Sequence, residues 1–359
     1  NEHLKIANAE EPISSTVEEE LNDVYAPFQF TEIKPTSAKK EIRLIDAISE
    51  GLGQSLEKYE DLVIMGQDIA DYGGVFKITE GFVEQFGKDR IRNTPICESG
   101  IVATAMGLSI NNMKAVVEMQ FGDFVSSGFN PIVNYLAKVN YRWNQNADVV
   151  VRMPCGAGVG AGPFHSQTNE AWFTKTPGLK VVYPAFPQDA KGLLTASIED
   201  PNPVLFFEHK ALYRSIRQDV PEDYFTIPLG KAAHLREGNS VSIITYGAGV
   251  HWALDHLASN EEIDADVIDL RTLQPLDEEA IFNSVKRTGK VLLLQEDSMF
   301  GGIMSDISAL IAEHCFEDLD APIKRVASLP TPIPFAANLE EKYLAKHRLA
   351  TSLEELLAY

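Results

Sequence analysis

Short, almost uninterrupted apolar runs alternate with helical stretches along most of this chain, and they constrain its fold more than any other feature. They cover residues 62–65, 115–117, 149–151, 181–183 and 204–207 in the first half, and residues 241–246, 266–270 and 291–294 in the second. A strand that is apolar on both faces has to be buried on both faces, as a parallel strand is when helices cover its sheet from either side. The pattern therefore predicts an α/β fold with mostly parallel sheets.

The order of these runs predicts two α/β domains in tandem. Residues 213–228 are polar and punctuated by proline, which is typical of a domain boundary. We therefore expect one domain over residues 41–225 and a second over residues 226–359. Residues 1–40 are acidic and only intermittently apolar, and residues 15–18 have the spacing of a capping box. This first segment is predicted to contain a short helix followed by a linker.

Composition limits the classes of partner. Of the 359 residues, 45% are hydrophobic, which is enough for two packed domains and too much for a disordered chain. The formal net charge of −21 would repel phosphate groups, so we expect neither nucleic acid nor a membrane as partner. The same charge suits a basic protein partner, or serves solubility alone.

Cysteine usage indicates a compartment. Cys97, Cys155 and Cys315 are far apart and form no CxxC pair, so we expect free thiols and no structural zinc. This usage is typical of a reducing compartment such as the bacterial cytoplasm or the mitochondrial matrix.

The glycine-rich segment 156–162 follows a predicted strand and invites comparison with a dinucleotide-binding loop. No helical pattern begins there, however, Pro163 interrupts the chain, and the acidic residue expected at the end of a second strand is missing. We expect instead a loop that shapes a cleft. The sequence also lacks the motifs of a P-loop, a serine nucleophile and a histidine-based metal site.

One carboxylate has an unusual setting. Glu98 lies between an expected strand and a helix of mostly small residues, 102–108. It is either a helix-start charge that the helix dipole stabilises or a buried acid with a chemical role. Taken alone, these residues favour the structural interpretation.

Six short segments between about Ile42 and the C-terminus have a distinctive sequence. They cover residues 73–76, 94–100, 118–124, 164–167, 177–182 and 267–272. In order and spacing they resemble the beta subunits of thiamine-diphosphate-dependent 2-oxo acid dehydrogenases, of the branched-chain (2-oxoisovalerate) and pyruvate types. The resemblance implies two tandem three-layer α/β/α domains, a transketolase-like pyrimidine-binding domain followed by a transketolase C-terminal-like domain.

The resemblance assigns roles to four residues. Glu98 would hydrogen-bond a ring nitrogen of the aminopyrimidine of thiamine diphosphate, which favours the tautomer that removes the thiazolium proton. Phe124 would stack on the pyrimidine, and Gln120 would line the same pocket. His165 would contact the substrate carboxylate or the acyl intermediate and move a proton near neutral pH. The alternatives are a core phenylalanine for Phe124 and a surface histidine for His165.

Two loops complicate the resemblance. Many relatives carry a second histidine just before the Pro-Gly pair at 177–178, where this chain has Lys175 and Thr176. The loop with Asp200 and Asn202 matches one that contributes to a structural potassium site in several relatives, although a plain turn explains its composition equally well.

Half of the expected active site is missing from the chain. It lacks the Gly-Asp-Gly and distant Asn-Asn pattern with which such enzymes hold magnesium and the diphosphate. The resemblance implies that an alpha subunit holds the magnesium. Because residues 17–28 resemble the closing helix of an alpha subunit, we expect either a separate beta subunit or the beta portion of a fused polypeptide.

The expected function is the oxidative decarboxylation of a 2-oxo acid, branched-chain first and pyruvate next, with transfer of the acyl group to a lipoyl group. The expected partners are the alpha part, a second beta copy and the lipoyl acyltransferase core. We expect the core to dock on the second domain, near the acidic clusters 278–279, 317–320 and 340–341. The competing hypotheses are a transketolase or deoxyxylulose-phosphate synthase fragment, and a non-catalytic assembly subunit of the same fold.

Overall fold

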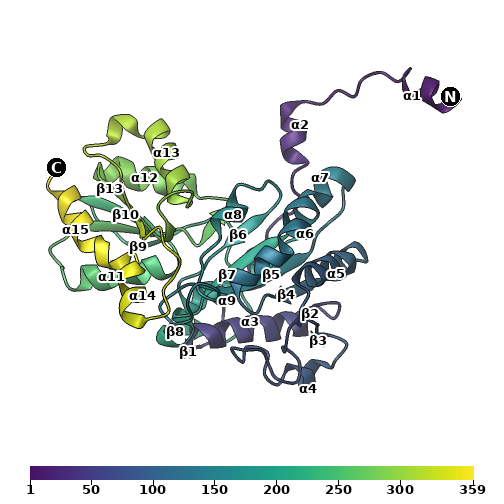
Figure 1. The fold of residues 1–359 in the computed structure, drawn as a ribbon, viewed down its shortest axis with the longest axis horizontal. Helices are drawn as coiled ribbons and strands as arrows, with labels where there is room; N and C mark the ends of the chain where they lie inside the picture. Colours follow the sequence, from purple (N-terminus) through teal and green to yellow (C-terminus); the bar gives the residue numbers. More distant parts are fainter.

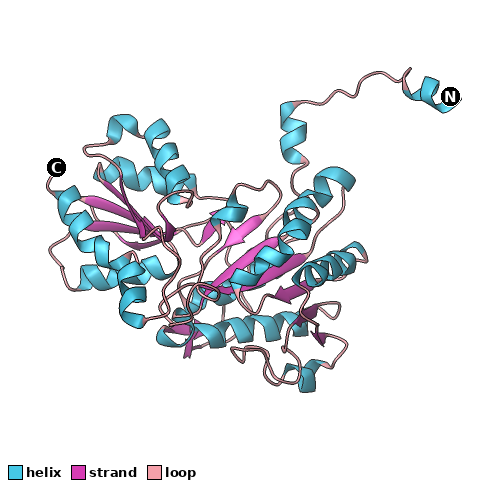
Figure 2. Cartoon of the chain, viewed as in Figure 1, coloured by secondary structure: helices cyan, strands magenta, loops and turns pink.

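The larger of two main sheets occupies the first half of the chain (Figures 1 and 2). In the computed structural model, which describes residues 1–359, its parallel strands are β2 (Val63–Gly66), β3 (Ile91–Asn93), β4 (Ala115–Glu118), β5 (Val149–Cys155), β6 (Lys180–Val182) and β7 (Val204–His209). The antiparallel strand β12 (Thr272–Gln274) completes the sheet, whose order is β12-β6-β7-β5-β4-β2-β3.

Helices cover both faces of this sheet. One face packs on α3 (Leu44–Lys58) and α9 (Pro187–Glu199), and the other packs on α5 (Glu98–Ile110), α6 (Phe129–Asn134) and α7 (Val139–Trp143). Neighbouring strand residues alternate between the two layers, so Val116 contacts the first and Val117 the second. Both side chains are fully buried, which confirms the prediction from the apolar runs.

A second sheet with the order β14-β13-β10-β11-β9 occupies the other half of the molecule. Its strands are β9 (Ala233–Arg236), β10 (Val241–Thr245), β11 (Ala265–Asp269), β13 (Val291–Ser298) and β14 (Lys324–Ser328), all parallel except β9. Helices α11 (Ala248–Ala258) and α15 (Lys346–Leu357) pack on one face, and α12 (Glu278–Thr288) and α13 (Met304–His314) on the other. The predicted fold class, two α/β/α units with mostly parallel sheets, is confirmed.

The two halves are joined by more than the linker. Strand β12 follows the second half's β11 in sequence but pairs with β6 of the first sheet. One hydrophobic cluster contains Val117 and Leu205 from the first sheet together with Ile268 and Leu293 from the second. The polar stretch predicted as a boundary contains strand β8 (Arg217–Pro221), which pairs with β1 (Lys39–Arg43).

Two short helices precede the first sheet and extend away from it (Figure 1). They are α1 (Glu2–Ala7) and α2 (Val17–Asn22). The capping box at α2 lies one residue later than predicted: Thr16 is the N-cap, and its hydroxyl accepts from the Glu19 amide at 3.2 Å. The predicted position of the box was therefore wrong by one residue.

The remaining elements are short. They are α4 (Phe82–Phe86), α8 (Ala171–Thr174), α10 (Leu212–Ser215), α14 (Ala337–Tyr343) and the 3-10 helices η1 (Gly122–Gly128), η2 (Leu136–Lys138) and η3 (Phe316–Asp318). None of the helices combines the length and apolar character that crossing a membrane requires.

Candidate functional site

Polar side chains follow neighbouring strands of the first sheet at their carboxyl ends, where ligands of parallel α/β sheets bind. Gln67 and Asp68 follow β2, Glu98 follows β3 and Gln120 follows β4. The loop that carries His165 follows β5. Because β3, β2, β4 and β5 are adjacent, all four predicted site residues lie along one edge of the sheet.

Glu98 is buried at the first position of α5. The Gln67 side-chain amide donates to its Oε1 at 3.1 Å, whereas Oε2 makes no hydrogen bond within the chain. Gly128 of η1 lies beside this residue, and a Cβ at position 128 would be in ordinary contact with the Glu98 backbone at 3.5 Å. One carboxylate oxygen is thus fixed, and the other is available to a ligand.

Gln120 is held by Asp68, a residue outside the predicted site. Its side-chain amide donates to Asp68 Oδ2 at 2.9 Å. Asp68 has a left-handed backbone, with φ of 58°, a conformation that aspartate tolerates better than most residues. The pair Gln67-Asp68 therefore orients two predicted site residues, Glu98 and Gln120. A polar pair directly after an apolar strand is the sequence signal that marks it.

Phe124 and His165 pack edge to face, with 5.4 Å between ring centroids. Phe121 contacts both, at 5.6 Å from Phe124 and 4.7 Å from His165, and Phe76 lies 5.7 Å from Phe121. Phe124 and His165 are each half-buried, so neither is a plain core residue or a fully exposed surface residue. The sequence does not mark Phe121 as central, because its contacts with Phe76 and His165 join segments far apart in the chain.

The loop around His165 is tied back to η1. Asp123 Oδ1 accepts from the backbone amide of Gln167 at 3.1 Å and from its side-chain amide at 2.9 Å. This contact fixes the loop two residues beyond the histidine. Lys175, which stands near the place of the second histidine of many relatives, is exposed and lines a cavity of about 400 Å³ with Ser126, Phe129 and Trp172.

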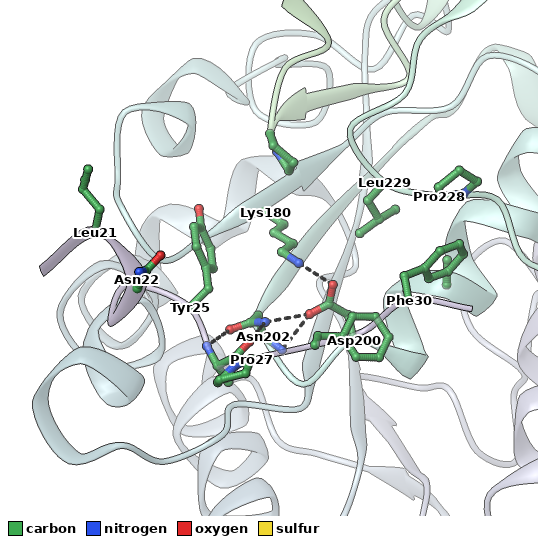
Figure 3. A pocket seen from close by; sticks show the side chains of 14 residues that line it. Leu21, Asn22, Tyr25, Pro27, Phe30, Lys180, Asp200, Asn202, Pro228 and Leu229 are labelled. Atoms are coloured by element: carbon green, nitrogen blue, oxygen red, sulfur yellow. Dashed lines mark hydrogen bonds and ion pairs between the residues drawn. The ribbon is translucent and has the colours of Figure 1, made fainter. Parts of the chain in front are cut away.

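Asp200 and Asn202 lie apart from this edge, beside a cavity of about 460 Å³ (Figure 3). The Lys180 ammonium pairs with Asp200 Oδ2, and Asp200 Oδ1 accepts from the Asn202 side chain at 2.9 Å. Asn202 in turn binds both backbone groups of Ala26, accepting from its amide at 2.7 Å and donating to its carbonyl at 3.1 Å. The positive charge beside this carboxylate therefore comes from Lys180, and the expected potassium ion stays a prediction.

The N-terminal segment is fastened to the first sheet's domain at this loop. Tyr25 donates its hydroxyl to the carbonyl of Leu179 at 3.0 Å, and the Asn140 side chain donates to the carbonyl of Asp23 at 2.8 Å. Together with the Ala26 contacts, these hydrogen bonds hold residues 23–26 against the domain.

Three carboxylates lie where the two halves meet: Glu170 and Glu296 are buried, and Asp297 is half-buried. Burial and the charge of Asp297 raise the pKa of Glu170 to about 8, and burial raises the pKa of Asp297 to about 6. Tyr246 of the second half donates to Glu170 Oε1 at 2.6 Å. Burial would also raise the pKa of Glu296, but the charge of His209, at 2.7 Å, holds it below its ordinary value.

An arginine inside the first sheet pairs with two further carboxylates. Arg152 donates to Glu118 at 2.7 Å and to Glu208 at 2.7 and 2.8 Å. Tyr213 adds a hydrogen bond to Glu208 at 2.6 Å. Since these three charged residues belong to β4, β5 and β7, the network joins the strands that lead into the site.

Comparison with known proteins places both halves of the chain. Residues 40–215 match the family described as transketolase, pyrimidine binding domain, and residues 230–348 match transketolase, C-terminal domain. A split-gene transketolase described as an inactive beta4 tetramer superposes with a TM-score of 0.70 at 22% identity, covering 88% of this chain and 98% of that one. At this identity the superposition speaks for the fold alone.

Curated relatives extend along most of the chain. The 2-oxoisovalerate dehydrogenase subunit beta of Bacillus subtilis (strain 168) is 44% identical over 321 residues, 88% of this chain and 98% of the relative. The acetoin:2,6-dichlorophenolindophenol oxidoreductase subunit beta of the same organism is 42% identical, covering 84% and 93%. Its pyruvate dehydrogenase E1 component subunit beta is 41% identical, covering 86% and 96%.

Proposed function

Because this chain belongs to the family of 2-oxo acid dehydrogenase beta subunits, built from transketolase-type pyrimidine-binding and C-terminal domains, we propose that it is the beta component of such a complex. Its reaction would be the thiamine-diphosphate-dependent decarboxylation of a 2-oxo acid, followed by transfer of the acyl group to a lipoyl group. The observation that carries the proposal is the placement of Glu98, buried, with one oxygen held by Gln67 and the other unpartnered, at the sheet edge that also holds Phe124 and His165.

The chain's own residues fit one half of a thiamine site. When bound, thiamine diphosphate supplies the carbon nucleophile of the reaction. Glu98 Oε2 can hydrogen-bond a ring nitrogen of the pyrimidine, and Phe124, half-buried at the edge, offers an aromatic face for stacking. Gln120, fixed by Asp68, would border the same pocket.

His165 would act on the substrate side. It sits beside Phe124, on a loop held by the Gln167–Asp123 contacts. From there an imidazole can orient the substrate carboxylate and exchange a proton near neutral pH.

The other half of the site is proposed to come from an alpha partner, which would hold magnesium and the diphosphate. Helix α5, which begins with Glu98, leaves Ala103, Thr104 and Ile110 exposed, and Ile96 just before it is 83% exposed. A helix that is apolar on its buried and exposed faces alike is typical of a buried position. This exposed face adjoins Glu98, so a subunit covering it would also close the site.

The relatives favour this function over the transketolase alternative. We propose a branched-chain 2-oxo acid as first substrate, because the 2-oxoisovalerate subunit is 44% identical, and pyruvate as the next candidate, with its subunit at 41%. The compartment would be the bacterial cytoplasm or the mitochondrial matrix.

The test is a reconstitution of the chain with its alpha partner, thiamine diphosphate and magnesium, assayed on a panel of branched-chain 2-oxo acids, pyruvate and a ketose phosphate. We expect decarboxylation of a 2-oxo acid, and a loss of a few powers of ten in the Glu98→Gln variant, which keeps the shape and removes the charge. Glu57→Gln, which removes the charge of the exposed glutamate in a similar Gln–Glu contact, is the control. Turnover of the ketose phosphate alone, no turnover at all, or an unimpaired Glu98→Gln variant would contradict the proposal.

A further inference from the structure

We propose that the second domain positions His165, through two carboxylates, Glu340 and Glu296, that bind the backbone of the loop carrying it. The inference deepens the proposed function and rests on it for the role of His165. The inference is based on the glycine-rich segment 156–162, which has no role in the site described above.

The backbone of this segment alternates between positive and negative φ. Gly156, Gly158, Gly160 and Gly162 have φ of 87°, 86°, 71° and 68°, so every second residue is left-handed. Successive amides in such a conformation form a concavity that binds anions. Glycine is the residue that adopts this backbone without strain.

Carboxylates of the second half bind the amides of this segment. Glu340 accepts from the Gly158 amide at 2.9 Å through Oε1 and from the Gly160 amide at 3.0 Å through Oε2. Glu296 Oε1 accepts from the Ala157 amide at 2.7 Å. Glu340 is 4% exposed and Glu296 5%, whereas the donors Gly158 and Gly160 are themselves exposed.

Apolar contacts reinforce the carboxylates. Ala157 is buried in a small cluster with Ile333, Tyr343 and Leu344 of the second half. Phe335 lies against Gly162, where a Cβ would fall 2.2 Å from its ring. Only two residues separate that glycine from His165, so these contacts fix the approach to the histidine.

The base of the loop is fixed in the same way. His209 pairs with Glu296 and packs on Gly156, where a Cβ would fall 2.2 Å from its Nε2. The Lys210 ammonium donates to the Gly156 carbonyl at 2.9 Å. The loop is therefore held at its base by β7 and along its length by the second half.

Loss of Glu340 would leave the amides of Gly158 and Gly160, both exposed residues, to bind water instead of a fixed acceptor, in a segment that glycine makes flexible. The His165 ring would then be free to leave its place against Phe121 and Phe124. A displacement of about 1 Å can cost on the order of 100-fold in rate. The same geometry corrects one expectation: Glu340 faces the loop, so within the acidic cluster 340–341 only Glu341 is available for docking.

The experiment compares Glu340→Ala and the milder Glu340→Gln with Glu354→Ala, an exposed carboxylate of α15, all assembled with the alpha partner. Hydrogen–deuterium exchange of the amides of 157–165 reports on the loop, and acyl transfer to a lipoyl domain reports on His165. We expect Glu340→Ala to speed exchange in this segment and to slow acyl transfer about 10- to 100-fold through kcat, with KM for the 2-oxo acid little changed. Glu340→Gln should show smaller effects in the same direction, and the control none.

A double variant separates positioning from general damage. If Glu340 acts through His165, adding Glu340→Ala to His165→Ala should slow acyl transfer no further. The inference would be overturned if the rate losses of the two single variants multiplied in the double variant. It would also be overturned if Glu340→Ala left exchange at 157–165 unchanged, or sped that exchange while acyl transfer stayed normal. Should Glu340→Ala fail to assemble, the same criteria apply to Glu340→Gln. A wild-type complex without 2-oxo acid activity would instead refute the proposed function, and the exchange comparison would still test the contact.

Discussion

His165 is held between aromatic neighbours rather than by a charged partner, with its ring 4.7 Å from that of Phe121. We expect His165→Ala to impair acyl transfer to a lipoyl domain by about 100-fold or more, because it removes the proton-exchanging group while leaving the Glu98 contacts intact. Decarboxylation with a dye acceptor and transfer with a lipoyl acceptor, measured separately, test this. Unchanged rates in both assays would return His165 to a surface role.

Glu170 gives a prediction about pH and stability. Its folded pKa of about 8 exceeds the ordinary 4.5, so the fold disfavours the ionised form, and this cost develops as pH rises from about 4.5 to about 8. A Glu170→Gln variant should therefore melt at a higher temperature than the wild type at pH 8.5, with the difference shrinking towards pH 5. Melting curves across this range check it, with the exposed Glu313→Gln as control. A difference that is constant with pH would contradict the assignment.

At the residue scale, the sequence predicted the residues of the site but not the residues that hold them in place. Glu98, Gln120 and His165 are visible through a resemblance, and their roles remain predictions. The partners of Gln67 and Phe121 are not, because they depend on which strands become neighbours: β2 lies between β3 and β4, and β4 lies beside β5, an order that no spacing along the chain reveals. The same holds for Glu340, whose partner glycines are about 180 residues away.

Among the elements, the three strands β4, β5 and β7 share one buried ionic network, which is costly to leave incomplete. Arg152→Met would strand Glu118 and Glu208, whose side chains are 3% and 0% exposed, and should lower the free energy of unfolding by about 3–5 kcal/mol. Denaturant titration measures the loss. Lys88→Met, which breaks an exposed pair with Asp71, should cost at most about 1 kcal/mol.

A second variant distinguishes charge from packing in this network. Glu208→Gln added to Arg152→Met removes one of the stranded charges, so it should recover part of the lost stability. No recovery would mean that the arginine contributes by filling space.

The elements were more predictable than the site. Apolar runs located the core strands because burial on both faces leaves a direct trace in composition, as at β5 and β7. The polar strand β8 escaped detection, since it pairs with β1 at the surface and its sequence resembles a linker. Composition also does not reveal that β12, which belongs to the second half in sequence, pairs with β6 of the first sheet.

For the whole molecule, the acidic charge predicts salt-sensitive assembly. Three exposed carboxylates surround Phe316, which is itself 75% exposed: Glu317, Asp318 and Asp320. A basic module of the acyltransferase core would find here an apolar contact surrounded by negative charge. We expect the affinity of the intact chain for such a module to fall steeply between about 50 and 500 mM salt, as the Debye length shrinks from roughly 14 to 4 Å.

Charge reversal tests which cluster forms the contact. Asp318→Lys with Asp320→Lys should weaken binding strongly, whereas Glu278→Lys with Glu279→Lys on α12 should have a smaller effect. Binding measured by calorimetry that is independent of salt would mean that the charge serves solubility and that docking occurs elsewhere.

The crossing of β12 into the first sheet also sets the order in which this protein can be completed during synthesis. The ribosome releases residues 41–225 before it has added residue 272. Until then β6 is an edge strand without its partner β12, and the apolar surface that later contacts Ile268 and Leu293 is exposed. Unpaired strand edges of this kind pair with other chains, so we expect chaperones to bind the first half during synthesis. Once complete, the two halves share one core and should melt as a single calorimetric transition.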